Sequence, residues 1–389
     1  MNTDPLDLER AQEAFASSTD GTVGIEEEFA ILDPETLELV PRFEELRDEA
    51  QDDALLAASI AGELISSEIE IRSGRGEDVH DAIRLQRDVR TRLFAHAARH
   101  GAALGASGTH PWADFREQPN IDTDHYRRVV DGLQYVARRN NTFSLHVHVG
   151  VQDLGRAVLT CDRLRPVLPV LLAASANSPF VDGLDSGLHS ARTQVFTRSF
   201  PRCGVPDAYG GWAAYRAYLE MLVATGSIVE STQVWWSVRP HLAFGTVEVR
   251  ICDAQGTAGE SEELTKLIVA CVLQAARDVS DGVPFRDPER RLVEENLWRA
   301  IRWGLDGRMI DLDRLVEEPT RASIERLLEW TAPVRAEHGI DPAAPGINGA
   351  QRRRAEIAEG ATLHEAFAAS VEETARTYAP ATDPEVQTP

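Results

Sequence analysis

Hydrophobic and polar residues alternate in several short segments of the first two thirds of the chain, which is the pattern of half-buried strands. We expect strands over Thr22–Leu32, Leu37–Val40, Leu64–Ile71, Ala103–Ser107, Thr142–Val149, Val234–Arg239 and Gly245–Cys252. The turn sequence Asp33-Pro34-Glu35-Thr36 joins the first two strands, and the short connection Pro240–Phe244 joins the last two. Hairpins of this kind favour an antiparallel sheet.

Apolar residues recur every three to four positions in longer segments, which predicts helices. In the first two thirds these segments are Val79–His100, His125–Arg139, Leu164–Ala176 and Trp212–Val223. From about residue 260 every periodic segment is predicted to be helical, over Ser261–Asp278, Pro288–Trp303, Asp311–Val316, Arg321–Glu337, Gln351–Ala358 and Leu363–Tyr378. Strands followed by helices indicate an α+β fold. The sequence has no GxGxxG or GxxxxGK[ST] motif, so Rossmann and P-loop folds are not supported.

A single domain is expected over residues 21–378, with flexible ends over residues 1–20 and 379–389. The N-terminal residues lack the basic and apolar regions of a signal peptide, and no apolar run reaches the length of a membrane helix. The cysteines are scattered without CxxC spacing, which indicates reduced thiols; they are Cys161, Cys203, Cys252 and Cys271. We therefore expect a cytoplasmic protein.

Acidic residues outnumber basic ones, because 63 Asp and Glu against 40 Lys and Arg give the 389-residue chain a net charge of −23. This balance argues against nucleic acid or an anionic membrane surface as a partner. It allows a nucleotide, because a bound metal ion reverses the local sign of a site. The charge alone is explained either by solubility in high salt or by a site built from carboxylates.

Four of the expected strands carry charged or histidine residues on one face, although carboxylates are depleted in strands. Successive strand residues point to opposite faces, so each polar pair lies on one side and aliphatic residues on the other. The pairs are Glu26 and Glu28, Glu68 and Glu70, His146 and His148, and Glu248 and Arg250. Each pair alone also fits a solvated edge strand or an ordinary polar face. The four together indicate a site on one face of the sheet.

This site suits hard cations, Mg²⁺ in the first place and Mn²⁺ as the alternative, because it is rich in carboxylates and has few histidines. Four arginines, Arg192, Arg198, Arg239 and Arg250, lie in predicted loops or strands rather than on exposed helix faces. A guanidinium group binds carboxylate or phosphate with two parallel hydrogen bonds. Carboxylates, metals and arginines together are suited to the activation of a carboxylate by ATP.

The same segments resemble the glutamate–cysteine ligase family 2, whose members are ATP-dependent carboxylate–amine ligases. The resemblance extends from about Thr22 to Ala375. The matching segments occur in the family's order and include TVGIEEEFAILDPET (22–36), GELISSEIEIRSG (62–74), GASGTHPWA (105–113), LHVHVGVQD (145–153), SARTQVF (190–196), WWSVRPH (235–241), GTVEVRICDAQ (245–255) and NGAQRRR (348–354). Any one of them is weak support, whereas the ordered series is strong.

The resemblance implies a glutamine-synthetase/glutamate–cysteine-ligase-like catalytic fold with a curved, mainly antiparallel sheet as the active-site face. It implies metal ligands at Glu26, Glu28, Glu63, Glu70, His146 and Glu248. Glu63 comes from the resemblance alone, because its position in the pattern does not single it out. The resemblance further implies substrate or ATP contacts by Arg192, Arg239, Arg250 and His148, with catalytic roles for Arg239 and Arg250.

The implied reaction joins a carboxylate to an amine through an acyl phosphate, with L-glutamate, L-cysteine and ATP giving γ-glutamylcysteine, ADP and phosphate. His148 and Glu27 are candidates for the base that deprotonates the amine. The partners are small molecules, and relatives suggest a homodimer. Two other classes remain open: a metal-dependent hydrolase of amides or phosphates on the same face, and a non-catalytic binding relative.

Overall fold

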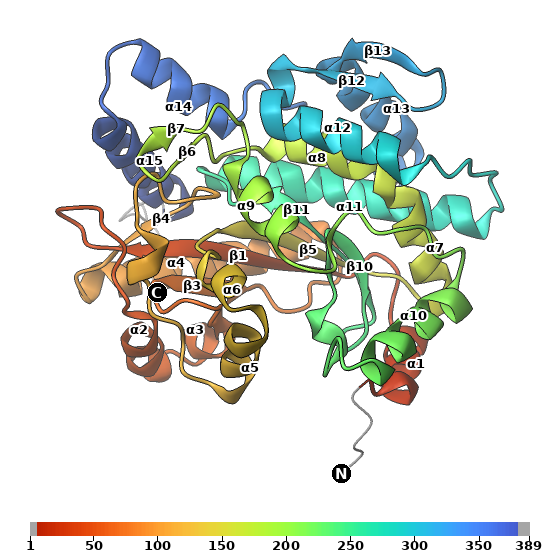
Figure 1. Ribbon diagram of the computed structural model, residues 1–389, viewed down its shortest axis with the longest axis horizontal. Coiled ribbons are helices and arrows are strands. Elements are labelled where there is room, and N and C mark those ends of the chain that lie inside the picture. Colours follow the sequence, from red (N-terminus) through yellow and green to blue (C-terminus); the bar gives the residue numbers. More distant parts are fainter. Residues whose placement is uncertain (1–5, 380–389) are drawn as a thin grey trace, which may run out of the picture.

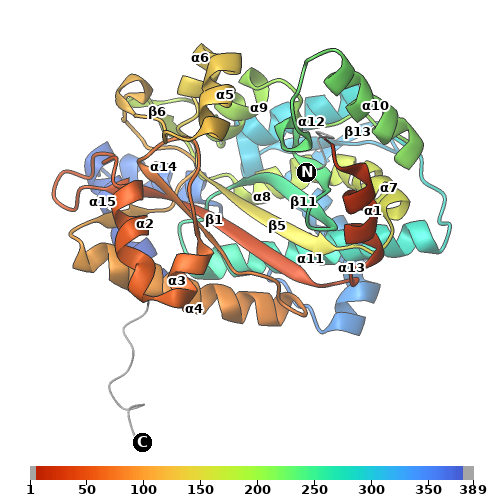
Figure 2. The same ribbon diagram turned by 90° about the horizontal axis from the view of Figure 1, so that it is seen from below.

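An antiparallel sheet crosses the middle of the molecule and joins strands that lie far apart in the sequence (Figures 1 and 2). The computed structural model describes residues 6–379, and its main sheet has the order β10-β11-β5-β1-β3-β2, with β4 paired to the end of β1. The strands are β1 (Val23–Leu32), β2 (Ile60–Ala61), β3 (Glu68–Arg72), β4 (Ala103–Gly105), β5 (Ser144–Gly150), β10 (Val238–His241) and β11 (Thr246–Asp253). All pairings within this sheet are antiparallel, which confirms the predicted α+β class.

Three two-stranded pairs lie outside the main sheet among the described residues. They are β6 (Phe180–Val181) with β7 (Leu184–Asp185), β8 (Cys203–Gly204) with β9 (Trp235–Trp236), and β12 (Arg308–Asp311) with β13 (Val316–Pro319). The last pair shows that the helix predicted over Asp311–Val316 is wrong. The Asp311 carboxylate accepts the backbone N–H groups of Asp313 and Arg314, and Leu315 has a φ of 55°, so this segment forms a turn.

Helices cover one face of the sheet and flank its edges (Figure 1). In chain order they are α1 (Leu8–Ala16), α2 (Phe43–Glu49), α3 (Ala54–Ser59), α4 (Val79–Arg99), α5 (Asp124–Leu133), α6 (Tyr135–Arg138), α7 (Leu154–Leu164), α8 (Leu168–Ser175), α9 (Ala191–Ser199), α10 (Trp212–Ala224), α11 (Ala258–Ser280), α12 (Arg290–Trp303), α13 (Thr320–His338), α14 (Gly349–Ala358) and α15 (Leu363–Tyr378). The helix predicted over His125–Arg139 is interrupted, because Gln134 has a φ of 50° between α5 and α6. The long helices α4 and α11 begin at side-chain caps, Asp78 and Thr257.

The hydrophobic core lies between the aliphatic face of the sheet and the helices α7, α8 and α11. Ile25, Val147 and Val249 are each at most 1% exposed and belong to one cluster with residues of these helices. Every residue of α8 is buried, which is the environment expected of a helix that is apolar on all sides. Burial of this face orients the alternate residues of the same strands toward the opposite side.

The first helix differs from the sequence prediction, which placed a flexible segment over residues 1–20. Leu8–Ala16 form α1, and Phe15 is fully buried in the core. Leu8, Ala11 and Phe15 follow helical spacing, and they pack against the core together. The strand predicted over Leu37–Val40 is a single bridge between Leu32 and Leu39. Of the predicted flexible end over 379–389, only Ala379 lies inside the described residues.

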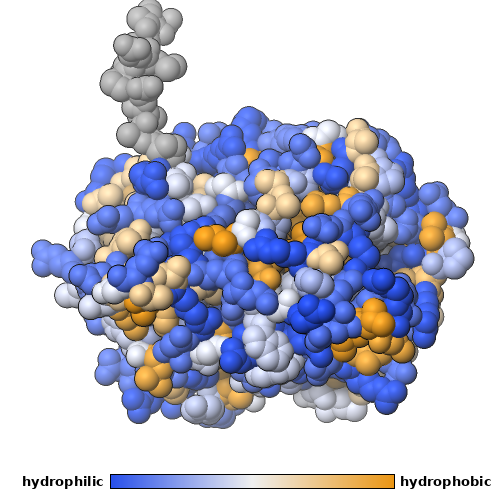
Figure 3. Space-filling model, turned by 90° about the horizontal axis from the view of Figure 1, so that it is seen from above, coloured by the Kyte–Doolittle hydropathy of each residue, from blue (hydrophilic) through white to orange (hydrophobic). Residues whose placement is uncertain are grey.

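The surface in Figure 3 is mostly hydrophilic, and its hydrophobic side chains occur in small scattered groups. Only eleven Asp and Glu side chains are buried among the described residues, so most of the acidic residues lie at the solvated exterior. Within residues 6–379, no helix combines the length and the apolar character needed to cross a membrane.

Candidate active site

The strand registers place the predicted site residues in rows across one face of the sheet. Glu26 of β1 lies opposite His146 of β5, and Glu28 lies opposite Glu70 of β3. On the other side of β5, His148 lies opposite Glu248 of β11, and Glu248 lies opposite Arg239 of β10. A β-bulge between Val249 and Cys252 shifts the register beside His146 and places Arg250 there. The alternation of side chains along the strands thus places charged and histidine residues from five strands on one surface.

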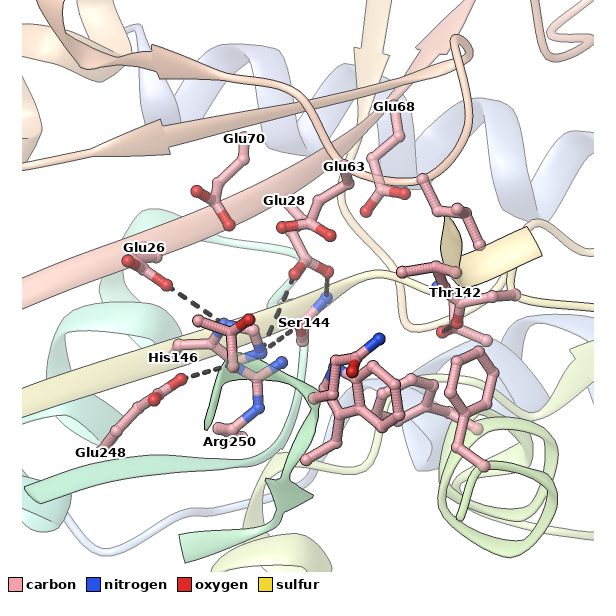
Figure 4. A pocket seen from close by; sticks show the side chains of 18 of the residues that line it. Glu26, Glu28, Glu63, Glu68, Glu70, Thr142, Ser144, His146, Glu248 and Arg250 are labelled. Carbon is pink, nitrogen blue, oxygen red and sulfur yellow. Dashed lines mark hydrogen bonds and ion pairs between the residues drawn. The ribbon is translucent and has the colours of Figure 1, made fainter. Parts of the chain in front are cut away.

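This surface lines a cavity of about 380 Å³ (Figure 4). All the sequence-predicted site residues line it, namely Glu26, Glu28, Glu63, Glu70, His146, His148, Arg192, Arg239, Glu248 and Arg250. A second cavity, of about 450 Å³, adjoins the first and lies beside α1. The two cavities share Glu26, Arg72, His148 and Phe244 as walls. The sheet face therefore offers two adjoining compartments: the first contains the cluster of carboxylates, and Glu26 is the carboxylate that also borders the second.

Glu63 reaches the cavity from a loop rather than from a strand. The sequence predicts a strand from Leu64, but β3 begins only at Glu68, and the preceding loop carries Glu63 over the face of β3. Gly62 makes this path available, because a Cβ atom there would lie 2.7 Å from the Phe43 ring. Its carbonyl oxygen accepts a hydrogen bond from the Tyr126 hydroxyl. Strand alternation does not apply to a loop, so the sequence pattern could not predict that Glu63 faces the cavity.

The carboxylates on the β3 side of the cavity repel one another strongly. Burial and the neighbouring Glu28 raise the pKa of Glu63 to about 7. Burial and Glu28 also raise the pKa of Glu68 well above its usual range, and burial and Glu26 do the same for Glu70. Glu68 is 1% exposed, and its Oε2 atom has no hydrogen-bond partner within the part of the chain that the structure describes. The buried carboxylates on the β3 side would therefore be stabilised by an additional cation.

The carboxylates on the β11 side are compensated by cationic neighbours. Burial alone would raise the pKa of Glu248, but Arg239 and Arg250 hold it well below its usual range. Burial likewise opposes the shift at Glu26, where His148 and His146 nevertheless keep the pKa well below its usual range. Arginine and histidine side chains of the protein itself thus keep Glu248 and Glu26 ionised, in contrast to the carboxylates on the β3 side.

The two histidines of β5 have different electrostatic surroundings. Burial and then Arg250 lower the pKa of His146, whereas for His148 the carboxylates of Glu26 and Glu248 outweigh burial and raise it. His146 Nδ1 lies 3.3 Å from Glu26 Oε2, and its Nε2 lies 2.8 Å from Ser144 Oγ. The backbone N–H of Ser144 donates to Glu28 over 2.5 Å, so residues of β5 contact both Glu26 and Glu28 of β1 (Figure 4).

Three sets of side chains within residues 6–379 bring potential ligand atoms within 4.8 Å of one another. The sets are Glu26, Glu70 and His146; Glu26, His148 and Glu248; and Glu28, Glu63 and Glu70. Carboxylate oxygens with one imidazole form the donor set that Mg²⁺ and Mn²⁺ accept and that softer, thiolate-seeking metals do not. The raised pKa values on the β3 side and the unpaired Glu68 oxygen fit the same type of cation.

The three predicted arginines differ in how many of their donors the protein itself occupies. Arg239 donates to Glu248 Oε2 over 2.6 Å and to the carbonyl oxygens of Thr232 and Val234. Arg192 and Arg198 lie in α9 rather than in a loop or strand as predicted. Arg192 donates to the backbone carbonyls of Arg250 and Ile251, and Arg250 Nη1 donates to Glu248. The Nε atoms of Arg192 and Arg250 have no partner in the described chain, so each of these two arginines keeps a donor for a further anionic group.

Arg72, which the sequence analysis did not name, also belongs to the cavity. It donates to Glu70 Oε1 over 2.6 Å and lies 3.5 Å from Glu26. Arg72 follows the alternation of β3 that singled out Glu68 and Glu70, so that pattern contained the necessary signal. Glu68 lines the cavity as the alternation predicts, although the resemblance did not imply it as a ligand. The suggestion that Glu27 acts as the base is wrong, because Glu27 points to the opposite face and forms a buried ion pair with Arg90.

The fold, an antiparallel sheet with helices on one face and an acidic, arginine-bearing cavity on the other, occurs in other proteins. Solved structures share this fold: a glutamate–cysteine ligase from Francisella tularensis in complex with AMP (TM-score 0.67, 9% identity, 93% of this chain and 90% of that chain covered) and a bifunctional glutathione synthetase from Pasteurella multocida (TM-score 0.65, 13% identity, 95% and 54% covered).

The sequence comparison is more specific than the fold. The family model described as glutamate-cysteine ligase family 2 matches residues 22–376. Two proteins named "Putative glutamate–cysteine ligase 2" are similar, one from Solibacter usitatus (39% identity, 82% of each chain covered) and one from Gloeobacter violaceus (38% identity, 87% of this chain and 93% of the relative covered). The chain belongs to the glutamate–cysteine ligase family 2 and is a ligase by this membership.

Proposed function

We propose that this protein joins the γ-carboxylate of L-glutamate to the amino group of L-cysteine with hydrolysis of ATP to ADP and phosphate. The observation that carries the proposal is the convergence of all the family-matched carboxylates, histidines and arginines on one cavity. The family membership, the relatives' names and the fold shared with a glutamate–cysteine ligase support the same reaction.

The proposed metal ligands are Glu26, Glu28, Glu63, Glu70, His146 and Glu248, with Glu68 as a neighbouring carboxylate. When bound, Mg²⁺ neutralises these carboxylates and the phosphates of ATP, which would otherwise repel each other in a buried site. Arg72 supplies part of this neutralisation from the chain itself, because it contacts both Glu70 and Glu26.

The reaction proposed for this site has two steps. An oxygen of the substrate carboxylate attacks the γ-phosphorus of ATP, the bond from that phosphorus to the ADP oxygen breaks, and an acyl phosphate forms. The amine nitrogen, having lost a proton, then attacks the acyl carbon and phosphate leaves, which gives the amide. Neither step requires a nucleophile from the protein, and positioning with electrostatic stabilisation supplies most of the rate.

The side chains of the cavity have distinct proposed tasks. Arg250 has a free Nε donor and stabilises charge on the transferred phosphoryl group. Arg239 acts on Glu248 and holds its carboxylate in place, and Arg192 supports the backbone on which Arg250 is carried. His148 lies on the wall shared by the two cavities and contacts substrate from there. The two compartments give ATP and the amino acid substrates separate space around one set of carboxylates.

The test is an assay of ADP formation with ATP and Mg²⁺, with glutamate and cysteine supplied singly and together. We expect turnover that requires both amino acids and yields γ-glutamylcysteine. Glu248→Gln should reduce kcat/KM at least 100-fold, because an anionic ligand of the proposed metal site is lost. Glu220→Gln is the matched control, since Glu220 is paired with Arg216 on the exposed side of α10. Phosphate release without an amine would instead favour a hydrolase.

A further inference from the structure

Glu27 is a buried carboxylate on the aliphatic side of the sheet, between the two proposed metal ligands of β1. It is 3% exposed, and five hydrogen bonds reach its two oxygen atoms. The donors are Arg90 Nε and Nη2, both at 2.6 Å, Gln86 Nε2 at 2.8 Å, Ser261 Oγ at 2.5 Å and Tyr378 Oη at 3.4 Å. Three helices, α4, α11 and α15, thus hold one side chain of the central strand.

Arg90 connects this carboxylate to the rest of the helical layer. It is 1% exposed, and its Nη1 donates to Glu262 of α11 over 3.0 Å. Its guanidinium carbon lies 4.8 Å from the centre of the Tyr378 ring, and the Tyr378 hydroxyl also donates to the carbonyl of Gln255. The Arg90 side chain makes four hydrogen bonds, two to Glu27 and one each to Ser261 and Glu262, so β1 is fixed to α4, α11 and α15 at one point.

Fold stability alone does not explain this arrangement. A buried ion pair gains little over apolar residues of the same volume, because desolvation of both charges offsets their attraction. The residues around Glu27 on this face, Ile25 and Phe29, are apolar and at most 1% exposed. A further apolar residue at position 27 would continue the core without the cost of two buried charges.

The ion pair also bears on the position of β1 within the sheet. A one-residue slip of β1 against its neighbours would turn Glu27 toward the cavity and Glu26 and Glu28 toward the helices. Such a slip would also turn the buried Ile25 and Phe29 toward the cavity, so the apolar residues exclude it. Within the observed register, the hydrogen bonds from Arg90 Nε and Nη2 to Glu27 fix β1 against α4 while Glu26 faces His146 and Glu28 faces Glu70.

We propose that Glu27 and Arg90 are positioning residues that hold Glu26 and Glu28 in the geometry required to bind the divalent cation. The inference rests on the metal site of the proposed function and adds residues that lie outside the cavity. Mg²⁺ demands near-ideal octahedral geometry, so a small rotation or slide of β1 is expected to weaken binding. Partners of this indirect kind commonly affect metal affinity by 10- to 100-fold.

The test measures Mn²⁺ binding to the full chain by electron paramagnetic resonance, at a temperature below the melting point of every variant. The variants are Glu27→Gln, which keeps the shape and removes the charge, and Arg90→Lys, which keeps the charge and removes the fork. Leu93→Ala is the matched control: Leu93 lies one turn further along α4, is fully buried and belongs to the cluster of Phe29. This substitution destabilises the packing between α4 and β1 without changing the contacts of Glu27.

We expect Glu27→Gln and Arg90→Lys each to lower the Mn²⁺ affinity at least about tenfold. Because the two residues act as one pair, the double variant should lose no more Mn²⁺ affinity than the more affected single variant. Leu93→Ala should keep the wild-type affinity within about twofold even where it lowers the melting temperature as much. Unchanged Mn²⁺ affinity in both charge variants, or an equal loss in Leu93→Ala, would overturn the proposal. Mn²⁺ binding without ligase activity would remove the proposed reaction and leave this inference standing, whereas a wild type that binds no Mn²⁺ would overturn both.

Discussion

Arg239 and Glu248 face each other on neighbouring strands, and Arg239 Nε donates to Glu248 Oε2 over 2.6 Å. Arg239 Nη1 donates to the backbone carbonyls of Thr232 and Val234, at 2.7 Å for Val234, and Nη2 donates to Glu248 Oε1 over 3.4 Å, so the guanidinium is directed at the protein. Arg250 donates to the same carboxylate from the cavity side. Glu248 is therefore oriented by one arginine, and the second arginine keeps a donor for a ligand.

This geometry predicts that Arg239→Lys lowers kcat/KM by about 10- to 100-fold, because the ammonium group cannot reproduce the contacts to Glu248 and to the backbone together. The loss should appear together with a higher Mg²⁺ requirement. Steady-state kinetics over a series of Mg²⁺ concentrations measures both quantities. Arg216→Lys in the exposed pair with Glu220 serves as the control and should behave as wild type. Equal kinetics in the two variants would contradict the role given to Arg239.

Divalent cations should stabilise the folded protein, because the pKa of Glu63, Glu68 and Glu70 is raised by burial and by mutual repulsion that a cation relieves. Saturation at 100 times the dissociation constant contributes about 2.7 kcal/mol. For a chain of this size we expect a rise of a few degrees in melting temperature, reversed by a chelator. Differential scanning fluorimetry with Mn²⁺ measures the shift. A Glu28→Gln/Glu70→Gln variant should show a smaller rise than wild type.

His110 should make the stability of the protein depend on pH. Its side chain is 1% exposed, its Nε2 donates to the Leu37 carbonyl over 2.8 Å, and its Nδ1 accepts the N–H of Ala113. Burial outweighs the bond to Leu37 and lowers the pKa of His110 from 6.5 to about 4. The unfolded chain therefore binds the proton more readily, and the contribution to stability is present above pH 6.5 and is lost as pH falls toward about 4.

The expected slope from this one group is about 1.4 kcal/mol per pH unit between those limits. Urea unfolding at pH 5, 6 and 7 measures it. His110→Asn should reduce the slope by that amount relative to wild type, and His189, whose pKa is also lowered to about 4, contributes equally to both proteins and cancels. Parallel curves for the two proteins would show that His110 is not the group responsible.

Cysteine chemistry should not contribute to turnover. Burial raises the pKa of Cys203 to about 11 and that of Cys252 to about 12, so neither thiol forms the reactive thiolate at neutral pH. Cys203→Ser is expected to keep kcat/KM within about twofold, and thiol reagents should modify Cys203 slowly in the folded enzyme. Loss of activity in Cys203→Ser with unchanged melting temperature would contradict this expectation.

The strand-borne part of the cavity could be predicted from the sequence because it depends on a local rule. Glu26, Glu28, Glu70, His146 and Glu248 occupy alternate strand positions, and the aliphatic residues between them fix which face is buried. Their presence on a common cavity wall agrees with that reasoning. Whether each side chain binds a metal or a substrate stays a prediction that the experiments above test.

Other features depend on contacts between distant segments. Asp311–Val316 has helical spacing but forms the turn of a hairpin. The Asp311 carboxylate stabilises this turn by accepting backbone N–H groups, whereas a short isolated helix is only marginally stable. Phe15 gives α1 a place in the core that the polar composition of residues 1–20 does not show. Glu63 required a family resemblance to be noticed, since its loop approaches β3 only in the folded molecule.

The sequence by itself determined the α+β class, the antiparallel strands and the residues that alternate on their polar face, because period-two alternation and turn residues act over short distances. Tertiary structure decided the registers that place Glu248 beside Arg239 and Glu28 beside Glu70. It also decided how Glu27, which the alternation turns toward the helices, is compensated there. Its counter-charge comes from Arg90, 63 residues along the chain, since a buried carboxylate persists only where the fold supplies one.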